Sequence, residues 1–325
     1  MGASTNRSLG KYILKRVIMA IPVFFLITFL VYVLISSAPT TIADVISAGQ
    51  QMTDAEYQAL IEEYNLDKNI VVRYVIWLGD FLKGSWGESY VSHVPVLGPI
   101  AQRIKPSLLL SITGMLLGML IGIPLGIMSG YKPNSGWDHT GNVICAICSA
   151  LPIFFLGLLL MYIFSVKLGW LPTFGMYSED GGHTVRDLIK HMTLPAILIA
   201  VQSVTSYIKQ TRCALLEVVH EEYIKTARSK GISERAVVVK HAFRNALSPV
   251  ITSIALSIPY MVAGSVVTEQ IFSWPGMGSL LISSIINKDY PVIMGVTVLI
   301  AIAVLLAGIL ADILYALSDP RVSYN

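Results

Sequence analysis

Charged side chains are scarce in this sequence. Asp, Glu, Lys and Arg make up 13% of its 325 residues, whereas hydrophobic residues make up 54%. Soluble chains usually carry about 25% charged residues and about 45–50% apolar ones. So little charge cannot cover the surface of a soluble protein of this length. The composition therefore excludes an ordinary soluble enzyme and indicates a membrane protein.

Cysteine is also rare, with three residues in the whole chain. Cys145 and Cys148 fall within a long apolar run, where we interpret them as small apolar residues of a helix and not as a redox pair. Cys213 has no evident partner in the sequence. The chain therefore predicts no disulfide framework.

Signatures of catalysis are missing. The sequence contains neither the glycine-rich P-loop that binds ATP phosphates nor a G-x-S-x-G nucleophile motif. His220 and Glu221 begin a string similar to a zinc-protease motif, but Ile224 stands where the second His ligand is needed. We therefore predict that this chain is not an enzyme and binds neither a metal nor another cofactor itself.

Charge is absent from six apolar stretches that are long enough to cross a bilayer. Each holds 18 to 28 uncharged positions, against the roughly 20 residues that a spanning helix needs. The predicted spans lie near residues 17–38, 107–130, 142–166, 193–211, 248–268 and 292–315. None has an ionisable residue at its centre, which disfavours a proton relay or an ion-coupled transporter.

A seventh uncharged stretch, residues 270–287, contains the sequence Trp274-Pro275-Gly276. Proline and glycine favour a turn, and a turn leaves backbone groups that lipid cannot satisfy. We interpret this stretch as a loop or short re-entrant turn and not as a seventh span.

Lysine and arginine divide unequally between the two sides that six spans define. One side carries 14 of them, whereas the short loops of the other side carry four. The positive-inside rule therefore places both termini, residues 1–16 and 316–325, in the cytoplasm. The net charge of +3 reflects this bias and contact with the lipid bilayer, and it does not indicate a nucleic-acid partner.

The segment 39–106 between the first two spans is the one sizeable region on the outer side. Thr53 followed by Glu56 has the pattern of a capping box and predicts a helix. A second amphipathic stretch, 69–83, carries Trp77 and Phe81. Trp prefers the headgroup zone, so this segment is either a lid packed on the helix bundle or a surface that meets a partner.

The cytoplasmic segment 212–247 has the composition of a helix, a glycine stop and a second helix. Its residues 221–230 are acidic at the start and basic toward the end, which suits the helix dipole. Gly231 supplies the stop. The small Ala227 and Gly231 leave room for a partner to approach, although a solvated charged loop is the alternative interpretation.

Two further groups of residues lie within the predicted spans. Glycine recurs every fourth residue in the second span, at Gly114, Gly118, Gly122, Gly126 and Gly130. This spacing predicts close helix packing, with a glycine-lined conduit as the alternative. Ser253, Ser257 and Tyr260 of the fifth span are candidates to line a pore, unless they bond within their own helix or to a neighbouring one.

Several local sequences complete a pattern that extends over nearly the whole chain. They are the residues at 12–16 (Tyr-Ile-Leu-Lys-Arg), 77–80 (Trp-Leu-Gly-Asp), 272–278 (Phe-Ser-Trp-Pro-Gly-Met-Gly), 289–291 (Asp-Tyr-Pro) and 319–321 (Asp-Pro-Arg). Together they resemble the dipeptide/oligopeptide/nickel branch of ABC importer permeases, and in particular its first-permease type.

The resemblance implies an all-α membrane protein with six transmembrane helices in the type I ABC importer permease fold. The outer helical segment would lie between helices 1 and 2, and residues 107–315 would form a five-helix core. The loop at 222–231 resembles the coupling segment of the superfamily, although Lys225 and Thr226 depart from its usual Glu and Ala. Residues that would contact an ATPase subunit are Glu222, Tyr223, Thr226, Ala227, Arg228, Lys230 and Gly231.

The implied function is that of a permease subunit in the inner membrane of a prokaryote. Its partners would be a second homologous permease, two ABC ATPase subunits that hold ATP and Mg²⁺, and an external solute-binding protein that delivers peptides. Nickel chelates, glutathione or oligosaccharides are alternative substrates. A stand-alone secondary transporter or channel is the alternative from another class.

Overall fold

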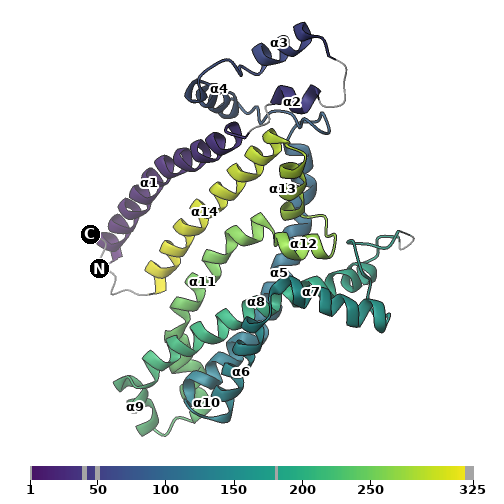
Figure 1. Ribbon diagram of the computed structural model, residues 1–325. Helices are drawn as coiled ribbons and strands as arrows, with labels where there is room; N and C mark the ends of the chain where they lie inside the picture. Colours follow the sequence, from purple (N-terminus) through teal and green to yellow (C-terminus); the bar gives the residue numbers. More distant parts are fainter. Residues whose placement is uncertain (1, 39–41, 48–51, 180–181, 319–325) are drawn as a thin grey trace.

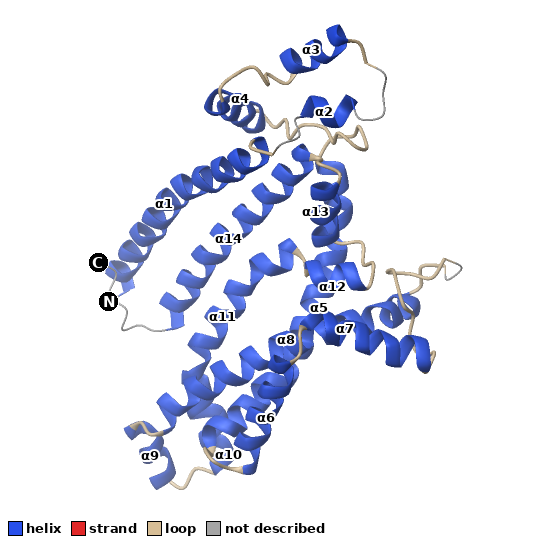
Figure 2. Cartoon of the chain, viewed as in Figure 1, coloured by secondary structure: helices blue, strands red, loops and turns tan. Residues whose placement is uncertain are grey.

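The computed structural model describes residues 2–38, 42–47, 52–179 and 182–318. These ranges are built from helices joined by short loops, and their only β-type pairing is an isolated bridge between Glu88 and Pro95 (Figure 2). Most of the predicted tail at 316–325, with its Asp-Pro-Arg sequence, lies outside the described residues.

Long apolar helices account for the predicted spans. They are α1 (Gly2–Ser36), α5 (Leu97–Tyr131), α8 (Val185–Val219), α11 (Arg244–Ala263) and α14 (Tyr290–Ser318). Five segments pass the length and hydropathy test for crossing a membrane, and one bent helix pair raises the number to six. The prediction of six spans is thereby confirmed within the described residues.

The third span is not the single helix that residues 142–166 predicted. The chain forms α6 (Gly136–Ala150), breaks, and continues as α7 (Ile153–Met161) and the π-helix η1 (Tyr162–Lys167), with a bend of 91°. Pro152 causes the break, because it lacks a backbone N–H and disfavours helical backbone in the residue before it. Leu151 accordingly has extended angles, with φ −97° and ψ 133°.

The seventh uncharged stretch is not a further span, but it is not a loop throughout. A turn at 272–276 joins α12 (Val266–Ile271) to the short helix α13 (Met277–Ile286), which leads into α14. With 10 residues, α13 is too short to cross a bilayer. Trp274 in the turn is fully buried, so surrounding protein and not lipid covers this irregular backbone.

The first and last spans lie side by side and run in opposite directions (Figure 1). Arg16 at the start of the apolar part of α1 pairs with Asp312 near the end of α14, with Nε and Oδ2 3.0 Å apart. The start of α1 and the end of α14 therefore lie at the same end of the bundle.

The predicted outer segment contains α2 (Ile42–Ser47), α3 (Asp54–Glu63) and α4 (Ile70–Leu82), which lie beside the end of α1 and the start of α14 (Figure 1). The predicted capping box is confirmed, because Thr53 and Glu56 each bond the backbone N–H of the other. Hydrogen bonds from the backbone and hydroxyl of Thr53 lower the pKa of the Glu56 carboxyl.

Helix α4 packs its aromatic side chains on α1. Tyr74 is buried, and its ring centroid lies 5.1 Å from that of Phe29 and 5.7 Å from that of Tyr32. The Tyr74 hydroxyl lies 2.9 Å from the hydroxyl of Thr28. Of the two interpretations of this segment, α4 thus fits a helix packed on its own bundle.

The centre of the bundle is the contact between α5 and α8. All five glycines of the four-residue repeat face α8, and a β-carbon on any of them would lie 2.6–2.8 Å from an α8 atom. Gly122, for example, leaves space for the Cβ atom of Tyr207, and Gly126 for that of Thr211. Glycine lets the two backbones approach closely where apolar side chains gain little over lipid.

Replacing one of these glycines should separate the two helices. We expect Gly122→Ala to destabilise the protein by about 1–3 kcal/mol, because its methyl group overlaps the Tyr207 side chain and the Val204 carbonyl. Gly308→Ala in α14 is the matched control, since no atom lies within 4 Å of the position that its methyl group would take. Thermal unfolding in detergent measures both, and equal midpoints for the two variants would contradict the packing role.

Candidate functional site

The predicted coupling segment forms a short helix at the end of the bundle where α8 finishes. Helix α9 (Glu222–Ser229) is followed by α10 (Glu234–Ala236) and the π-helix η2 (Val237–Phe243), which continues into α11. Ile224 and Ala227 are 0% and 5% exposed and pack against Leu215 of α8 and Val237 of η2. Spaced three residues apart, they place one face of α9 on the bundle.

This burial corrects one prediction. Ala227 does not leave room for a partner, because its side chain faces the protein's own core. Its small size instead lets α9 lie close to the last turns of α8. The other six predicted residues, which are exposed, form the outward surface of this unit: Glu222, Tyr223, Thr226, Arg228, Lys230 and Gly231.

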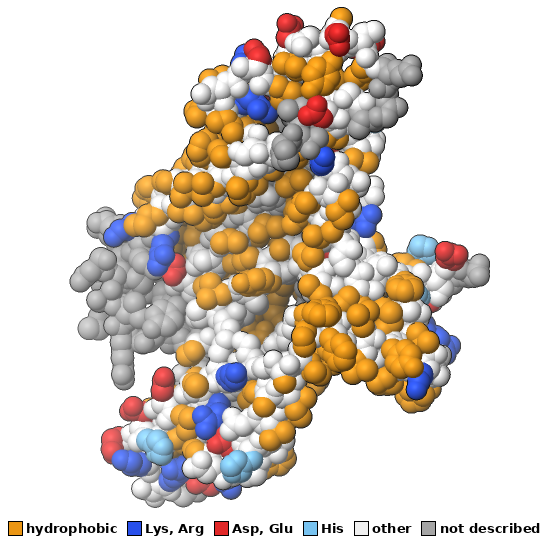
Figure 3. Space-filling view, in the orientation of Figure 1, with side chains coloured by type: hydrophobic (Ala, Val, Ile, Leu, Met, Phe, Trp, Pro, Cys, Tyr) orange, Lys and Arg blue, Asp and Glu red, His pale blue; other side chains and the backbone are white. Residues whose placement is uncertain are grey.

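The outward surface of α9 is polar. Lys225 pairs with Glu222 across one turn, with Nζ and Oε1 2.7 Å apart, and Thr226 donates its hydroxyl to the Glu222 carbonyl at 3.0 Å. Figure 3 shows charged side chains gathered at the end of the molecule where α9 and α10 lie, below an apolar band. Surface ion pairs of this kind stabilise little, so the face is available to bind another polar surface.

Gly231 ends this unit for a conformational reason. Its φ is +72°, which L side chains rarely adopt, while no atom lies within 4 Å of the position that a β-carbon would occupy. The backbone N–H of Gly231 donates to the Arg228 carbonyl at 2.9 Å, which closes the last turn of α9. The left-handed backbone at this residue turns the chain toward α10.

Arg228 joins α9 to the end of α5. Its guanidinium pairs with Glu234 at 3.2 Å and lies 5.9 Å from the centre of the Tyr131 ring. The Tyr131 hydroxyl in turn donates to the Glu234 carboxylate. One acidic side chain of α10 therefore connects the outward unit to the last residue of α5.

A buried ion pair fixes α6 against α8 just above this unit. Asp138 is 3% exposed and accepts two hydrogen bonds from Arg212, at 2.7 Å and 3.0 Å. The Asp138 carboxylate also accepts the backbone N–H of Asn134 at 2.9 Å. Together with the glycine contact, the pair holds α5, α6 and α8 as one unit at the ends that lie near α9.

A buried carboxylate ties α12 and α13 to the first half of α5. Glu269 is fully buried, and Ser107 donates its hydroxyl to Oε1 at 2.6 Å. A backbone N–H of α13 donates to Oε2 at 2.9 Å. Trp274 donates its indole N–H to the carbonyl of Pro106 at 3.0 Å. These bonds satisfy the irregular backbone around the turn.

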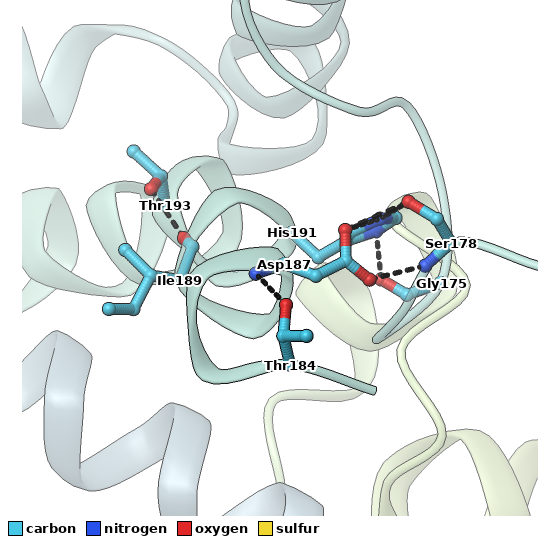
Figure 4. A network of polar contacts seen from close by, with 7 residues as sticks. All are labelled: Gly175, Ser178, Thr184, Asp187, Ile189, His191 and Thr193. Carbon is cyan, nitrogen blue, oxygen red and sulfur yellow. Dashed lines mark hydrogen bonds and ion pairs between the residues drawn. The ribbon is translucent and has the colours of Figure 1, made fainter. Parts of the chain in front are cut away.

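A group of polar side chains clamps the outer loop before α8 (Figure 4). Ser178 donates its hydroxyl to Asp187 at 2.8 Å, and its Oγ lies 3.1 Å from His191 Nε2. His191 Nδ1 lies 3.1 Å from the Gly175 carbonyl, which can only accept a hydrogen bond. In a catalytic triad, the carboxylate accepts a hydrogen bond from the histidine Nδ1–H. Here the Asp187 carboxylate bonds the serine, and Nδ1 of His191 faces the Gly175 carbonyl instead. This group serves to hold the loop.

The three candidate pore residues have different surroundings in α11. Ser257 donates its hydroxyl to the Ile254 carbonyl of its own helix at 2.7 Å, as the alternative interpretation expected. Ser253 is half-buried, and Tyr260 is 77% exposed. Tyr260 is therefore the one of the three that presents most of its surface outside the chain.

Several residues of these networks escaped sequence reasoning. Asp138 and Arg212, like Ser107 and Glu269, are far apart in sequence, and no local pattern predicts that they pair. Among the residues that the structure describes, no group of three His, Cys, Asp or Glu side chains could hold a metal ion.

Two family models match the chain. "Binding-protein-dependent transport system inner membrane component" matches residues 122–324, and the N-terminal model of such membrane components matches residues 9–111. The first match includes the whole of α9 and its supporting helices.

Relatives with curated names match over nearly their full length. The oligopeptide transport system permease protein AppB of Bacillus subtilis is 39% identical over 97% of this chain and 100% of its own length. The glutathione transport system permease protein GsiC of Salmonella typhimurium is 36% identical over 97% of this chain and 99% of its own.

A solved structure shares the fold. The chain resembles an inward-facing conformation of the MetNI methionine ABC transporter with a TM-score of 0.56. The match has 17% identity and covers 69% of this chain and 97% of the other. It shows that the two chains share an arrangement of helices.

Breaking the pair between Asp138 and Arg212 should loosen the contact of α6 with α8. We expect Asp138→Asn to cost about 3–5 kcal/mol, because the change leaves Arg212 with an uncompensated charge. Asp80→Asn is the control, since its pair with Lys83 is exposed and exposed pairs contribute about 0–1 kcal/mol. Thermal unfolding compares them, and equal losses would contradict a special role for Asp138.

Proposed function

The chain belongs to the family of inner membrane components of binding-protein-dependent transport systems, and we propose that it is the permease subunit through which peptides enter the cell. A second homologous permease completes the pore. Two separate ATPase subunits bind ATP with Mg²⁺, and an external binding protein delivers the peptide. This chain itself binds no cofactor and catalyses no reaction.

One observation carries the proposal: α9 has one face buried in the bundle and the other exposed, polar and rigidly supported. Ile224 and Ala227 hold it on α8, whereas Tyr223 and Thr226 face outward. A helix built in this way suits a groove on another subunit. Its links to α5 and α8 allow a movement of α9 to reach the membrane spans.

The mechanism follows from those links. When ATP draws the two ATPase subunits together, α9 moves with the subunit that holds it, and α5, α6 and α8 move as one body. The pore then changes from inward-open to outward-open, and hydrolysis restores the first state. The energy comes from the different affinity of the ATPase pair for the two conformations.

The proposed orientation places α9 and both chain ends in the cytoplasm. Six crossings and the excess of Lys and Arg on that side support this arrangement. The ion pair between Arg16 and Asp312 supports it too, because it joins the starting end of α1 to the finishing end of α14. The outer segment at 39–106 then faces the binding protein.

Peptides are the proposed substrate class because the chain matches an oligopeptide permease along its full length. Glutathione is the alternative that a second full-length relative supports, and glutathione is itself a modified tripeptide. Competition for uptake by unlabelled dipeptides, oligopeptides and glutathione, measured in a strain that expresses the complete system, distinguishes these substrates.

The proposed contact with an ATPase is tested by a charge on the outward face of α9. We expect Tyr223→Glu to lower ATP-dependent uptake at least ten-fold and to abolish co-purification of ATPase subunits, because Tyr223 is 39% exposed on that face. Val185→Glu is the control, since Val185 is 73% exposed at the other end of α8. Uptake by the chain alone, without ATPase partners, would instead support a stand-alone carrier.

Substitutions at Gly231 separate conformation from contact. Asn tolerates a positive φ and Val does not, so we expect Gly231→Asn to retain coupled uptake and Gly231→Val to hydrolyse ATP without uptake. The reason is the φ of +72° together with the open space around this residue. Equal failure of both variants would mean that crowding of the partner, and not backbone strain, explains the glycine.

A further inference from the structure

A cavity of about 460 Å³ lies on the outer side of the protein, away from α9 and its partners. Its walls come from the last turns of α1, from α4, from the loop before α5 and from the first turns of α14. Because α1 and α14 are membrane spans, their outer ends place this cavity at the level of the lipid headgroups.

The walls of the cavity are aromatic and rigid. Tyr32, Trp77, Trp86 and Tyr90 are among its lining residues. Asp289, just before α14, fixes the loop that carries Tyr90 by accepting its backbone N–H at 3.0 Å. The Ser89 hydroxyl donates to the same carboxylate at 2.5 Å. Burial raises the pKa of the Tyr90 phenol, so this side chain stays neutral.

One arginine in the cavity lacks part of its hydrogen bonding. Arg73 of α4 lines the cavity beside Tyr32, and its Nε is buried without a hydrogen-bond partner among the described residues. A guanidinium has five N–H donors and matches the oxygens of a phosphate. Among the described residues that line the cavity, Arg73 is the one arginine or lysine, so an anionic group that enters the cavity would be drawn to its guanidinium.

The remaining charges oppose a ligand that is purely anionic. Glu63 and Glu88 line the same cavity, and two carboxylates near one arginine would repel a second negative charge. Carboxylates together with tyrosine and tryptophan rings suit an ammonium group instead. The cavity thus combines a site for a phosphate with a site for an amine.

We propose that this cavity binds the headgroup of a phosphatidylethanolamine molecule from the outer leaflet. Its phosphate contacts Arg73, and its ammonium group lies toward Glu63, Glu88 and the aromatic rings. The acyl chains enter the bilayer beside α1, whose Leu30 and Leu34 are 52% and 72% exposed. The bound lipid joins the outer segment to α1 and α14.

The first experiment titrates lipids onto the full chain, with any subunits that co-purify, and counts bound lipid by native mass spectrometry. We expect dioleoyl phosphatidylethanolamine to bind at least five-fold more tightly than dioleoyl phosphatidylglycerol. Arg73→Gln should remove that preference, and Arg73→Lys should keep part of it. Arg186→Gln, at an exposed arginine outside the cavity, should leave it unchanged. Equal affinity for the two lipids, or a preference that survives Arg73→Gln, overturns the proposal.

A second experiment needs no variant. A phosphatidylethanolamine with a photoreactive headgroup is cross-linked to the wild-type chain, and the labelled peptides are mapped. Labels within 63–93 or 290–294 support the proposal, and labels confined to other segments overturn it. If the dipeptide Ala-Ala, added before irradiation, prevents the labelling, the cavity is assigned to a soluble zwitterion. That result also overturns the proposal.

Discussion

The close contact between α5 and α8 is the constraint on which the rest of the structure depends. In a bilayer, apolar side chains gain little by leaving lipid, so helices associate through shape and through polar contacts. Five glycines in register remove every side chain that could hold the two backbones apart. The remaining helices are arranged around this pair: α6 and α7 lie on one side, and α11 and α14 follow on the other (Figure 1).

Buried polar contacts occur where glycine packing alone would not fix how the helices are aligned along one another. The pair between Asp138 and Arg212 fixes α6 against α8 near α9, and Glu269 with Ser107 fixes the turn between α12 and α13 against α5. Buried polar groups of this kind tolerate one register only, because a shift of one residue leaves them unsatisfied. The α9 unit is thus attached to a framework whose helices cannot slide past each other without breaking a buried bond.

The sequence allowed much of this architecture to be predicted. Gaps between charges located the spans, and the spacing of glycines and the pattern from Thr53 to Glu56 are local features. The bend at Leu151 also had a local signal in Pro152, which the charge count did not use. Contacts such as that between Ser107 and Glu269 have no local signal in the sequence, because they depend on the register between distant helices. The burial of Ala227 depends in the same way on how α9 meets α8.

The position of α1 has a consequence for how the protein is made. This helix packs mainly on α14 and α4, and its apolar window is only 6% buried. Synthesis delivers α1 before α14, so α1 waits in lipid while the four crossings between them are inserted. The bond between Arg16 and Asp312 forms only after α14 has been made. A chain that lacks α14 therefore leaves α1 without the helix on which it mainly packs.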